Sequence, residues 1–84
     1  RYIKWYKDGQ KAIEGFYKKG KKNNIWAYWH ENGKKWKEET FKDGEKDGLE
    51  TVWYENGQKQ MEDTYKDGEW ISSKFWNEDG SVSE

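Results

Sequence analysis

Residue types that commonly carry catalysis are few in this chain. His30 is the only histidine, and it stands where Tyr6 and Tyr54 stand in two similar segments. Acid–base catalysis needs an organised partner group, and the chain has no cysteine that could act as a nucleophile. We therefore interpret His30 as an ordinary residue of an amphipathic strand, and we predict no catalytic residue.

Acidic residues also give no convincing site. Glu38-Glu39 and Glu62-Asp63 are adjacent pairs, and adjacent residues of a strand point to opposite faces, so neither pair forms a carboxylate dyad. The segment 43–48 superficially resembles a calcium loop but lacks the alternating oxygen ligands and terminal glutamate of an EF-hand. The sequence predicts no metal, no cofactor and no enzymatic activity.

Composition limits the remaining classes. The chain has 84 residues, enough for one small domain or a stack of small repeats, and a formal net charge of -1. This charge gives no case for binding nucleic acid. Aliphatic residues are scarce, but seven Trp, six Tyr and three Phe are expected to form the core. No apolar run approaches the length of a membrane span or a signal-peptide core.

One motif recurs along the whole chain. An aromatic run followed by Asn-Gly or Asp-Gly ends at Gly9, Gly33, Gly57 and Gly80. The first three lie 24 residues apart (33 − 9 = 57 − 33 = 24), and the last lies 23 after the third (80 − 57 = 23). A second glycine set, at positions 20, 44 and 68, has the same spacing of 24. A fixed period of this length indicates a repeat architecture.

Each repeat reads as an outgoing strand, a turn and a return strand. We expect short strands at 1–6, 11–17, 25–30, 35–41, 49–54, 59–65, 71–76 and 81–83, with two-residue type I′ turns at the Asn-Gly steps. We expect polar connectors at 21–24 and 42–48. The predicted fold is all-β: tandem antiparallel β-hairpin repeats, with a period of about 24, in an elongated, twisted, single-layer meander sheet. Residues 1–84 form one repeat domain with approximate units 1–24, 25–48, 49–71 and a truncated 72–84.

Stacked units place similar residues in columns. The columns are Trp5, Trp29, Trp53 and Trp76; Tyr17, Phe41 and Tyr65; Glu14, Glu38 and Glu62; and Lys11, Lys35 and Lys59. The glutamates are expected to pair with lysines across strands. A two-residue turn at Asn32-Gly33 would pair Trp29 with Trp36 on one face and place Phe41 with Tyr28 and Trp26 on the other. A three- or four-residue turn would change this register and could change which residues share a face. Both faces carry aromatics, so which face forms the core stays open.

The segment 47–59, with Tyr65-Lys66-Asp67-Gly68 after it, resembles the MORN-repeat variant of bacterial proteins, a YwqK-like antitoxin (immunity) repeat family. The resemblance covers nearly the whole chain, about three and a half units. Trp26 matches the tryptophan that this family usually places three residues before the paired aromatics, whereas Tyr2, Glu50 and Ser73 do not. The resemblance implies a non-enzymatic hairpin array that works by protein contact, as antitoxins or surface and scaffold repeats do.

Aromatic residues outside their expected columns are the candidates for partner contact. Trp36 stands where Ala12 and Gln60 stand, and Trp70 stands where Lys22 and Lys46 stand. With Tyr28 and Trp26, they could contact a protein hot spot or a sugar ring. The basic cluster Lys18, Lys19, Lys21 and Lys22 could contact an anionic surface such as lipid head groups, although a solvated connector is the simpler interpretation.

Two functional hypotheses follow. The first is a bacterial antitoxin or immunity protein that binds a toxin, which favours the bacterial cytoplasm over the cell surface. The second is a structural or surface repeat protein that contacts a scaffold, cell-wall glycan or membrane lipid. The strand expected at 1–6 would be a sheet edge, and exposed edges invite pairing. We therefore expect that this edge is covered by a further segment or self-associates with another chain.

Overall fold

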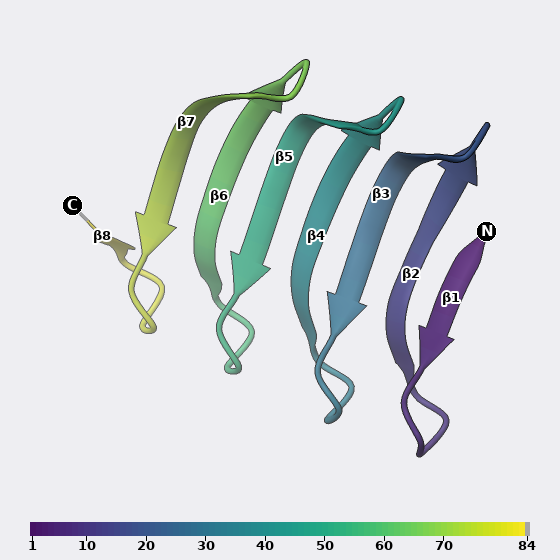
Figure 1. The fold of residues 1–84 in the computed structure, drawn as a ribbon. Helices are drawn as coiled ribbons and strands as arrows, with labels where there is room; N and C mark the ends of the chain where they lie inside the picture. Colours follow the sequence, from purple (N-terminus) through teal and green to yellow (C-terminus); the bar gives the residue numbers. More distant parts are fainter. Residues whose placement is uncertain (84) are drawn as a thin grey trace.

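The computed structural model describes residues 1–83. They form one antiparallel sheet in which strands adjacent in the sequence are adjacent in space (Figure 1). The strands are β1 (Tyr2–Trp5), β2 (Lys11–Lys18), β3 (Lys21–Trp29), β4 (Lys35–Lys42), β5 (Glu45–Trp53), β6 (Lys59–Lys66), β7 (Glu69–Trp76) and β8 (Val82–Ser83). The sheet measures 40 × 36 × 10 Å, so it is a flat single layer. The predicted all-β meander is confirmed.

Tight type I′ turns lie at the second glycine set. Lys19-Gly20, Asp43-Gly44 and Asp67-Gly68 each have two consecutive residues with positive φ, for example 50° at Asp43 and 87° at Gly44. This is the geometry that a two-residue type I′ hairpin requires. Strands β3 and β5 begin directly after the first two of these turns. The predicted polar connectors at 21–24 and 42–48 are therefore wrong, because most of their residues belong to strands.

The Asn-Gly turns have a different geometry. The Gly33 amide donates to the His30 carbonyl oxygen at 3.0 Å, and the His30 amide donates to the Lys34 carbonyl oxygen at 2.8 Å. Gly33 has a φ of 88°, but Asn32 is not in the positive-φ region. This is a three-residue loop, a type I turn closed by a left-handed glycine. The expected two-residue turn is therefore wrong, and the three-residue alternative is the one found. The Asn32 side-chain oxygen accepts from the Lys34 amide at 2.9 Å.

A β-bulge follows each of the first three of these loops. Tyr28 pairs with Lys37 and Trp29 pairs with Lys35, so Trp36 is the extra residue. The predicted pairing of Trp29 with Trp36 is wrong, although Ala27 and Ile25 do pair with Glu38 and Thr40. Ala12 and Gln60 are the extra residues in the first and third units. A bulge changes the face to which a side chain points, which decides where Trp36 lies.

A second irregularity lies in β3, β5 and β7. In β5 the paired residues Lys46 and Glu50 are four positions apart, whereas their partners in β4, Phe41 and Glu39, are only two positions apart. Asn24 and Gly48 have positive φ at this equivalent place, 62° and 114°. In β7 the paired residues Trp70 and Ser72 are two positions apart, whereas their partners in β6, Tyr65 and Thr64, are adjacent. Ile71 is therefore the one extra residue. This shorter irregularity accounts for the residue missing from the last unit.

The sheet has no covering layer among the described residues, so burial comes from neighbouring side chains on each face. The buried hydrophobic residues are Ala12, Trp26 and Ala27, and only Trp26 is large, with 2% of its surface exposed. Trp5 is 54% exposed. The expectation that the aromatics form a core is therefore wrong for most of them, because a single layer leaves both faces open to solvent.

Candidate contact surface

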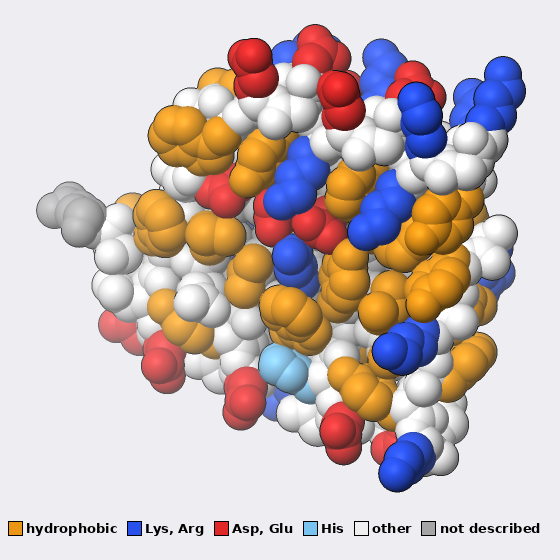
Figure 2. Space-filling model, in the orientation of Figure 1, with side chains coloured by type: hydrophobic (Ala, Val, Ile, Leu, Met, Phe, Trp, Pro, Cys, Tyr) orange, Lys and Arg blue, Asp and Glu red, His pale blue; other side chains and the backbone are white. Residues whose placement is uncertain are grey.

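One face of the sheet combines aromatic rings with buried charge, and we call it the Tyr28 face. Strand alternation and register place on it a row of residues from each strand. They are Tyr2, Lys4, Ile13, Tyr17, Lys22, Trp26, Tyr28, Trp36, Lys37, Glu39, Phe41, Lys46, Glu50, Val52, Met61, Asp63, Tyr65, Trp70, Ser73 and Phe75. Figure 2 shows hydrophobic side chains around a central group of acidic and basic ones.

Three acidic residues lie side by side at the centre of this face. Glu39 pairs with Glu50, and Glu50 pairs with Asp63, on adjacent strands. Their exposed fractions are 6%, 6% and 8%. Like charges on directly opposed strand positions repel one another, so this row requires compensation. The sequence pattern did not reveal it, because the register that aligns these residues depends on the bulges.

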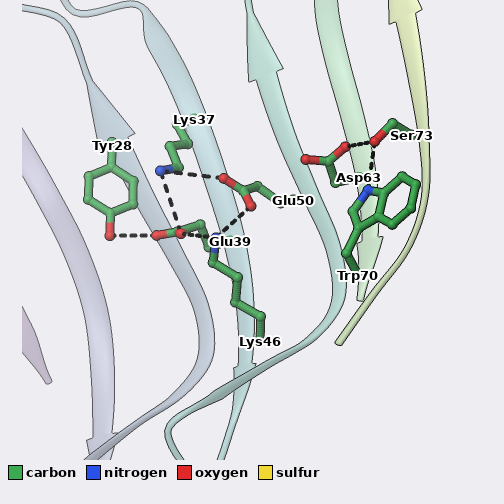
Figure 3. Close-up of polar contacts among 8 residues, drawn as sticks. All are labelled: Tyr28, Lys37, Glu39, Lys46, Glu50, Asp63, Trp70 and Ser73. Carbon is green, nitrogen blue, oxygen red and sulfur yellow. Dashed lines mark hydrogen bonds and ion pairs between the residues drawn. The ribbon is translucent and has the colours of Figure 1, made fainter. Parts of the chain in front are cut away.

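Two lysines neutralise the first two carboxylates (Figure 3). The Lys46 ammonium lies 2.8 Å from a Glu50 oxygen and 3.4 Å from a Glu39 oxygen. The Lys37 ammonium lies 3.4 Å and 3.5 Å from the same two carboxylates. The Tyr28 hydroxyl donates to Glu39 at 2.8 Å. Buried charges are tolerated when they are paired and hydrogen-bonded in this way.

The network shifts the protonation of its members. Burial alone would raise the pKa of the Glu39 carboxyl, but the Tyr28 hydrogen bond and the charges of Lys37 and Lys46 lower it below its usual range. Burial and the hydrogen bond to Glu39 raise the pKa of the Tyr28 hydroxyl. Although burial alone would lower the pKa of Lys46, its hydrogen bond to Glu50 and the Glu50 charge raise it. Glu39 and Lys46 are therefore charged at neutral pH, and Tyr28 is protonated.

Trp26 supports the Tyr28 face from within. Its ring stacks with Tyr2 at a centroid distance of 5.5 Å and meets Tyr17 edge-on at 5.1 Å. Its ring also lies against the backbone of Gly15, where any side chain would collide with the indole. With 2% of its surface exposed, Trp26 has almost no area to offer a partner. Its part in the surface is to position the aromatic neighbours.

Tyr28 and Trp36 lie together on this face. Their ring centroids are 5.9 Å apart, and the His30 ring lies 6.0 Å from that of Trp36. The two residues line a hollow of about 210 Å³, to which β1 and β2 contribute Lys4 and Ile13. The bulge thus brings two predicted contact residues together, and all their rings are half-buried.

Trp70 lies at the opposite end of the face. It is 59% exposed, more than any other tryptophan among the described residues. Its indole Nε1–H donates to the Ser73 hydroxyl oxygen at 2.8 Å, and the Ser73 hydroxyl donates to Asp63 (Figure 3). Trp36 is on β4 and Trp70 is on β7, so the predicted contact residues form two patches on one face.

The predicted basic cluster divides in two. Lys18, Lys19 and Lys21 are exposed around the β2–β3 turn. Lys22 is half-buried, and its ammonium lies 4.7 Å from the centre of the Trp26 ring and 5.1 Å from that of Phe41. These are cation–π distances. Lys22 therefore helps to hold the sheet, and three lysines remain available to an anionic surface.

The other face, which we call the Trp29 face, carries the Trp29, Glu38 and Lys35 columns. Each lysine binds a glutamate three residues later on its own strand, as in Lys35–Glu38 at 2.7 Å. The expected pairing across strands is wrong for these pairs, because the bulge between the two residues turns them to the same side. The Lys35 ammonium also lies 5.6 Å from the centre of the Trp29 ring. Intramolecular lysines therefore cover part of this face.

His30 and the buried carboxylates of the described residues lie against other groups of the chain. Among residues 1–83 no group of three or more His, Cys, Asp or Glu side chains could hold a metal ion. His30 contacts an aromatic ring, and the buried carboxylates are committed to lysines or to Ser73. What this geometry offers is a broad surface of rings and charges.

Comparison with known protein families supports the repeat that the turn glycines indicate. The MORN repeat variant matches residues 22–43 and 46–67. The chain belongs to the MORN repeat variant family. The two matched repeats start 24 residues apart (46 − 22 = 24), which equals the spacing of the turn glycines. Searches of curated proteins and of solved structures found no match.

Each matched MORN repeat begins near a type I′ turn and ends at the next one. The first covers most of β3 and β4, and the second covers most of β5 and β6. The central carboxylate–lysine network joins β3, β4 and β5, so it links the two repeats. Repeat modules of this kind generally mediate binding.

Proposed function

We propose that this MORN repeat protein is a non-enzymatic interaction module that binds a protein partner on its Tyr28 face. The observation that supports it is an uncovered sheet face with large exposed apolar side chains, Trp70 at 59% and Phe75 at 49%. Contiguous apolar surface of this kind marks interaction sites. A flat face built from tryptophan, tyrosine and paired charge also has the composition of protein interfaces.

The Tyr28 face is favoured over the Trp29 face because it carries Trp36 and Trp70, the two tryptophans that stand where other repeats have smaller or polar residues. Lysine ammonium groups lie against rings on both faces, 5.5–6.0 Å from Trp29 and Trp76 on the Trp29 face and 5.8 Å from Trp36 on the Tyr28 face. Trp70 is 59% exposed, more than any other tryptophan among the described residues. An aromatic side chain that is not already covered gains more from burial against a partner.

Within this function, we propose that the partner is a toxin domain and that the protein acts as a bacterial antitoxin or immunity protein. The support is the resemblance of residues 47–59 and 65–68 to the YwqK-like bacterial repeats. The competing class is a surface repeat that contacts glycan or anionic lipid. It draws on the exposed Lys18, Lys19 and Lys21.

Affinity capture from a lysate of the source cells tests the proposal. The tagged chain is compared with Trp36→Ala on the Tyr28 face and with Trp53→Ala, a half-buried tryptophan of the other face. We expect one stoichiometric protein that survives moderate salt, is weakened at least about tenfold by Trp36→Ala, and is unaffected by Trp53→Ala. Circular dichroism confirms that both variants fold.

Two results would overturn the proposal. Retention of the chain on cell-wall or lipid fractions without a protein partner would transfer the function to the surface-repeat class. Equal loss of partner in both variants would show that binding does not use the Tyr28 face in particular. The identity of a captured protein then decides the antitoxin assignment, since a toxin domain supports it and a scaffold protein contradicts it.

A further inference from the structure

One position on the Tyr28 face holds a different type of residue in the third repeat than in the first two. Tyr17 pairs with Lys22, Phe41 with Lys46, and Tyr65 with Trp70. The first two units therefore place a lysine where the third places a tryptophan. Each lysine reaches an aromatic ring of the next unit: Lys22 lies 5.1 Å from the Phe41 centroid, and Lys46 lies 4.9 Å from the Tyr65 centroid.

One carboxylate of the third unit lacks the two lysines that flank its equivalent in the second unit. Glu39 is flanked by Lys37 and Lys46, whose ammonium groups lie 3.5 Å and 3.4 Å from it. The equivalent carboxylate is Asp63, because 63 − 39 = 24, and the two lysine positions are taken by Met61 and Trp70. Within residues 1–83, no lysine or arginine lies within ion-pair distance of Asp63. Only the Ser73 hydroxyl donates to it from a side chain.

An anion in this position is unusual. Asp63 is 8% exposed, and carboxylates at such burial are normally paired with a cation. On the β5 side Asp63 lies opposite Glu50. On the β7 side its surroundings are largely apolar, with Met61 two residues away on the same face, Phe75 opposite Met61, and the Trp70 ring joined through Ser73. Trp70 and Phe75 stay 59% and 49% exposed. The site thus has a negative charge, an open aromatic wall and no internal counter-charge among the described residues.

We propose that this site, which we call the Asp63 seat, receives an arginine side chain from the protein partner. The inference rests on the proposed function and names the chemistry of the group that is bound. The partner's guanidinium would supply the charge that Lys37 and Lys46 supply to Glu39, and it would lie against the Trp70 ring as Lys46 lies against Tyr65. Arginine suits the seat better than lysine, because a planar guanidinium binds a carboxylate through two hydrogen bonds and stacks on an indole.

The seat can be tested without knowing the partner. The probe is N-acetylarginine amide, and the readout is the NMR resonance of the Trp70 indole Nε1–H. The matched control ligand is N-acetylcitrulline amide, which has a similar shape without charge. We expect saturable shifts with the arginine probe, at millimolar concentrations, and a response at least about tenfold weaker with citrulline or in Asp63→Asn.

Filling the seat from within gives a second test. Met61→Lys restores the lysine that the second unit has at position 37. We expect this variant to lose the arginine response and to unfold at a higher temperature than the natural chain. Asp63→Asn should cost less stability than Glu39→Gln, because Asp63 has no ion pair to lose. The loss of the arginine response is read by the NMR titration, and the two stability comparisons are read by thermal melts without ligand.

The outcomes separate this inference from the proposed function. Equal shifts with arginine and citrulline, or an unchanged arginine response in Asp63→Asn, would overturn the seat. A captured partner that ignores Asp63→Asn but responds to Trp36→Ala would also overturn the seat while supporting the binding face. A specific arginine response in the absence of any protein partner would support the seat and count against the proposed function alone.

Discussion

At the scale of single residues, the tyrosine that follows the outgoing strand of the first and third units links that repeat to the next. The Tyr6 hydroxyl donates to the Trp29 carbonyl oxygen at 2.6 Å, and the Tyr54 hydroxyl donates to that of Trp76 at 2.7 Å. His30 stands at the equivalent position of the second unit, and no side-chain hydrogen bond of His30 is found within the described part of the chain. The middle link of this series is therefore missing.

His30→Tyr should restore the missing link. A tyrosine hydroxyl at position 30 would reach the Trp53 carbonyl as Tyr6 reaches that of Trp29, and a net gain of about 0.5–1.5 kcal/mol in unfolding free energy is expected. Urea titration followed by tryptophan fluorescence measures it. Tyr54→Phe is the matched control and should lose a similar amount. If Tyr54→Phe is costly and His30→Tyr brings no gain, the proposed link does not form at position 30.

The Glu39 carboxylate makes stability depend on acid pH. Because its pKa is lowered in the folded chain, the unfolded chain takes up the proton at a higher pH than the folded chain does. Its contribution is present above the ordinary glutamate pKa of about 4.3, and it is lost as pH falls through the folded pKa. Lys46 behaves in the opposite way, because its pKa is raised in the folded chain. Its contribution to stability is present at neutral pH and is lost only at alkaline pH, as the pH rises through the folded pKa.

Glu39→Gln isolates this contribution. At neutral pH the variant should be less stable by about 1–3 kcal/mol, because two half-buried lysines lose a charged partner. The difference from the natural chain should shrink steadily below about pH 4. Denaturant titrations at a series of pH values measure it, with the exposed turn variant Glu31→Gln as the control. A difference that stays constant down to pH 2 would show that Glu39 is not held ionised by the network.

At the scale of elements, the two turn classes explain both what the sequence predicted and what it missed. Glycines at a fixed spacing indicate hairpin turns, whichever turn type they form. The strand order and the repeat period could therefore be predicted from the sequence. The dipeptides alone did not say that Asp43-Gly44 forms the type I′ turn and Asn32-Gly33 the wider loop. That difference introduces the bulge at Trp36 and decides which face it joins.

The candidate site was predictable only in part for the same reason. Trp36 and Trp70 could be singled out because they break their columns, and the structure leaves both at a surface. The acidic row could not, because Glu39, Glu50 and Asp63 become neighbours through a register that two irregularities per repeat determine. The missing counter-charge at Asp63 becomes visible only when the repeats are compared in three dimensions.

A turn variant follows from the backbone angles. Lys19 has a φ of 51°, a left-handed conformation that costs an ordinary side chain about 1 kcal/mol and that asparagine tolerates better. Lys19→Asn should therefore raise the unfolding free energy by about 0.5–1 kcal/mol. The control is Lys7→Asn in the wider N-terminal turn, where Lys7 is not in the left-handed region, and it should be close to neutral. Thermal melts measure the unfolding temperature of both variants. A larger gain in stability from Lys7→Asn than from Lys19→Asn would contradict the left-handed conformation of Lys19.

At the scale of the whole molecule, stability is a chain of neighbour interactions. Each strand packs against the strands beside it in a layer 10 Å thick, so no single core ties distant repeats together. Arrays of this kind behave as sums of repeat and interface terms. Strands paired on both sides should therefore open less readily than those paired on one side, such as β1 and β8.

Hydrogen exchange of the 84-residue chain tests this gradient. We expect the slowest amide exchange in β3 to β6 and progressively faster exchange toward β1 and β8, because opening from an end breaks one interface at a time. Within β7, the amides of Trp76 and Phe75, which pair with β8, should exchange more slowly than those facing outward from 69–74. A single protection level across all eight strands would instead mean that the sheet unfolds as one cooperative unit, and then the effects of substitutions in different repeats would not add.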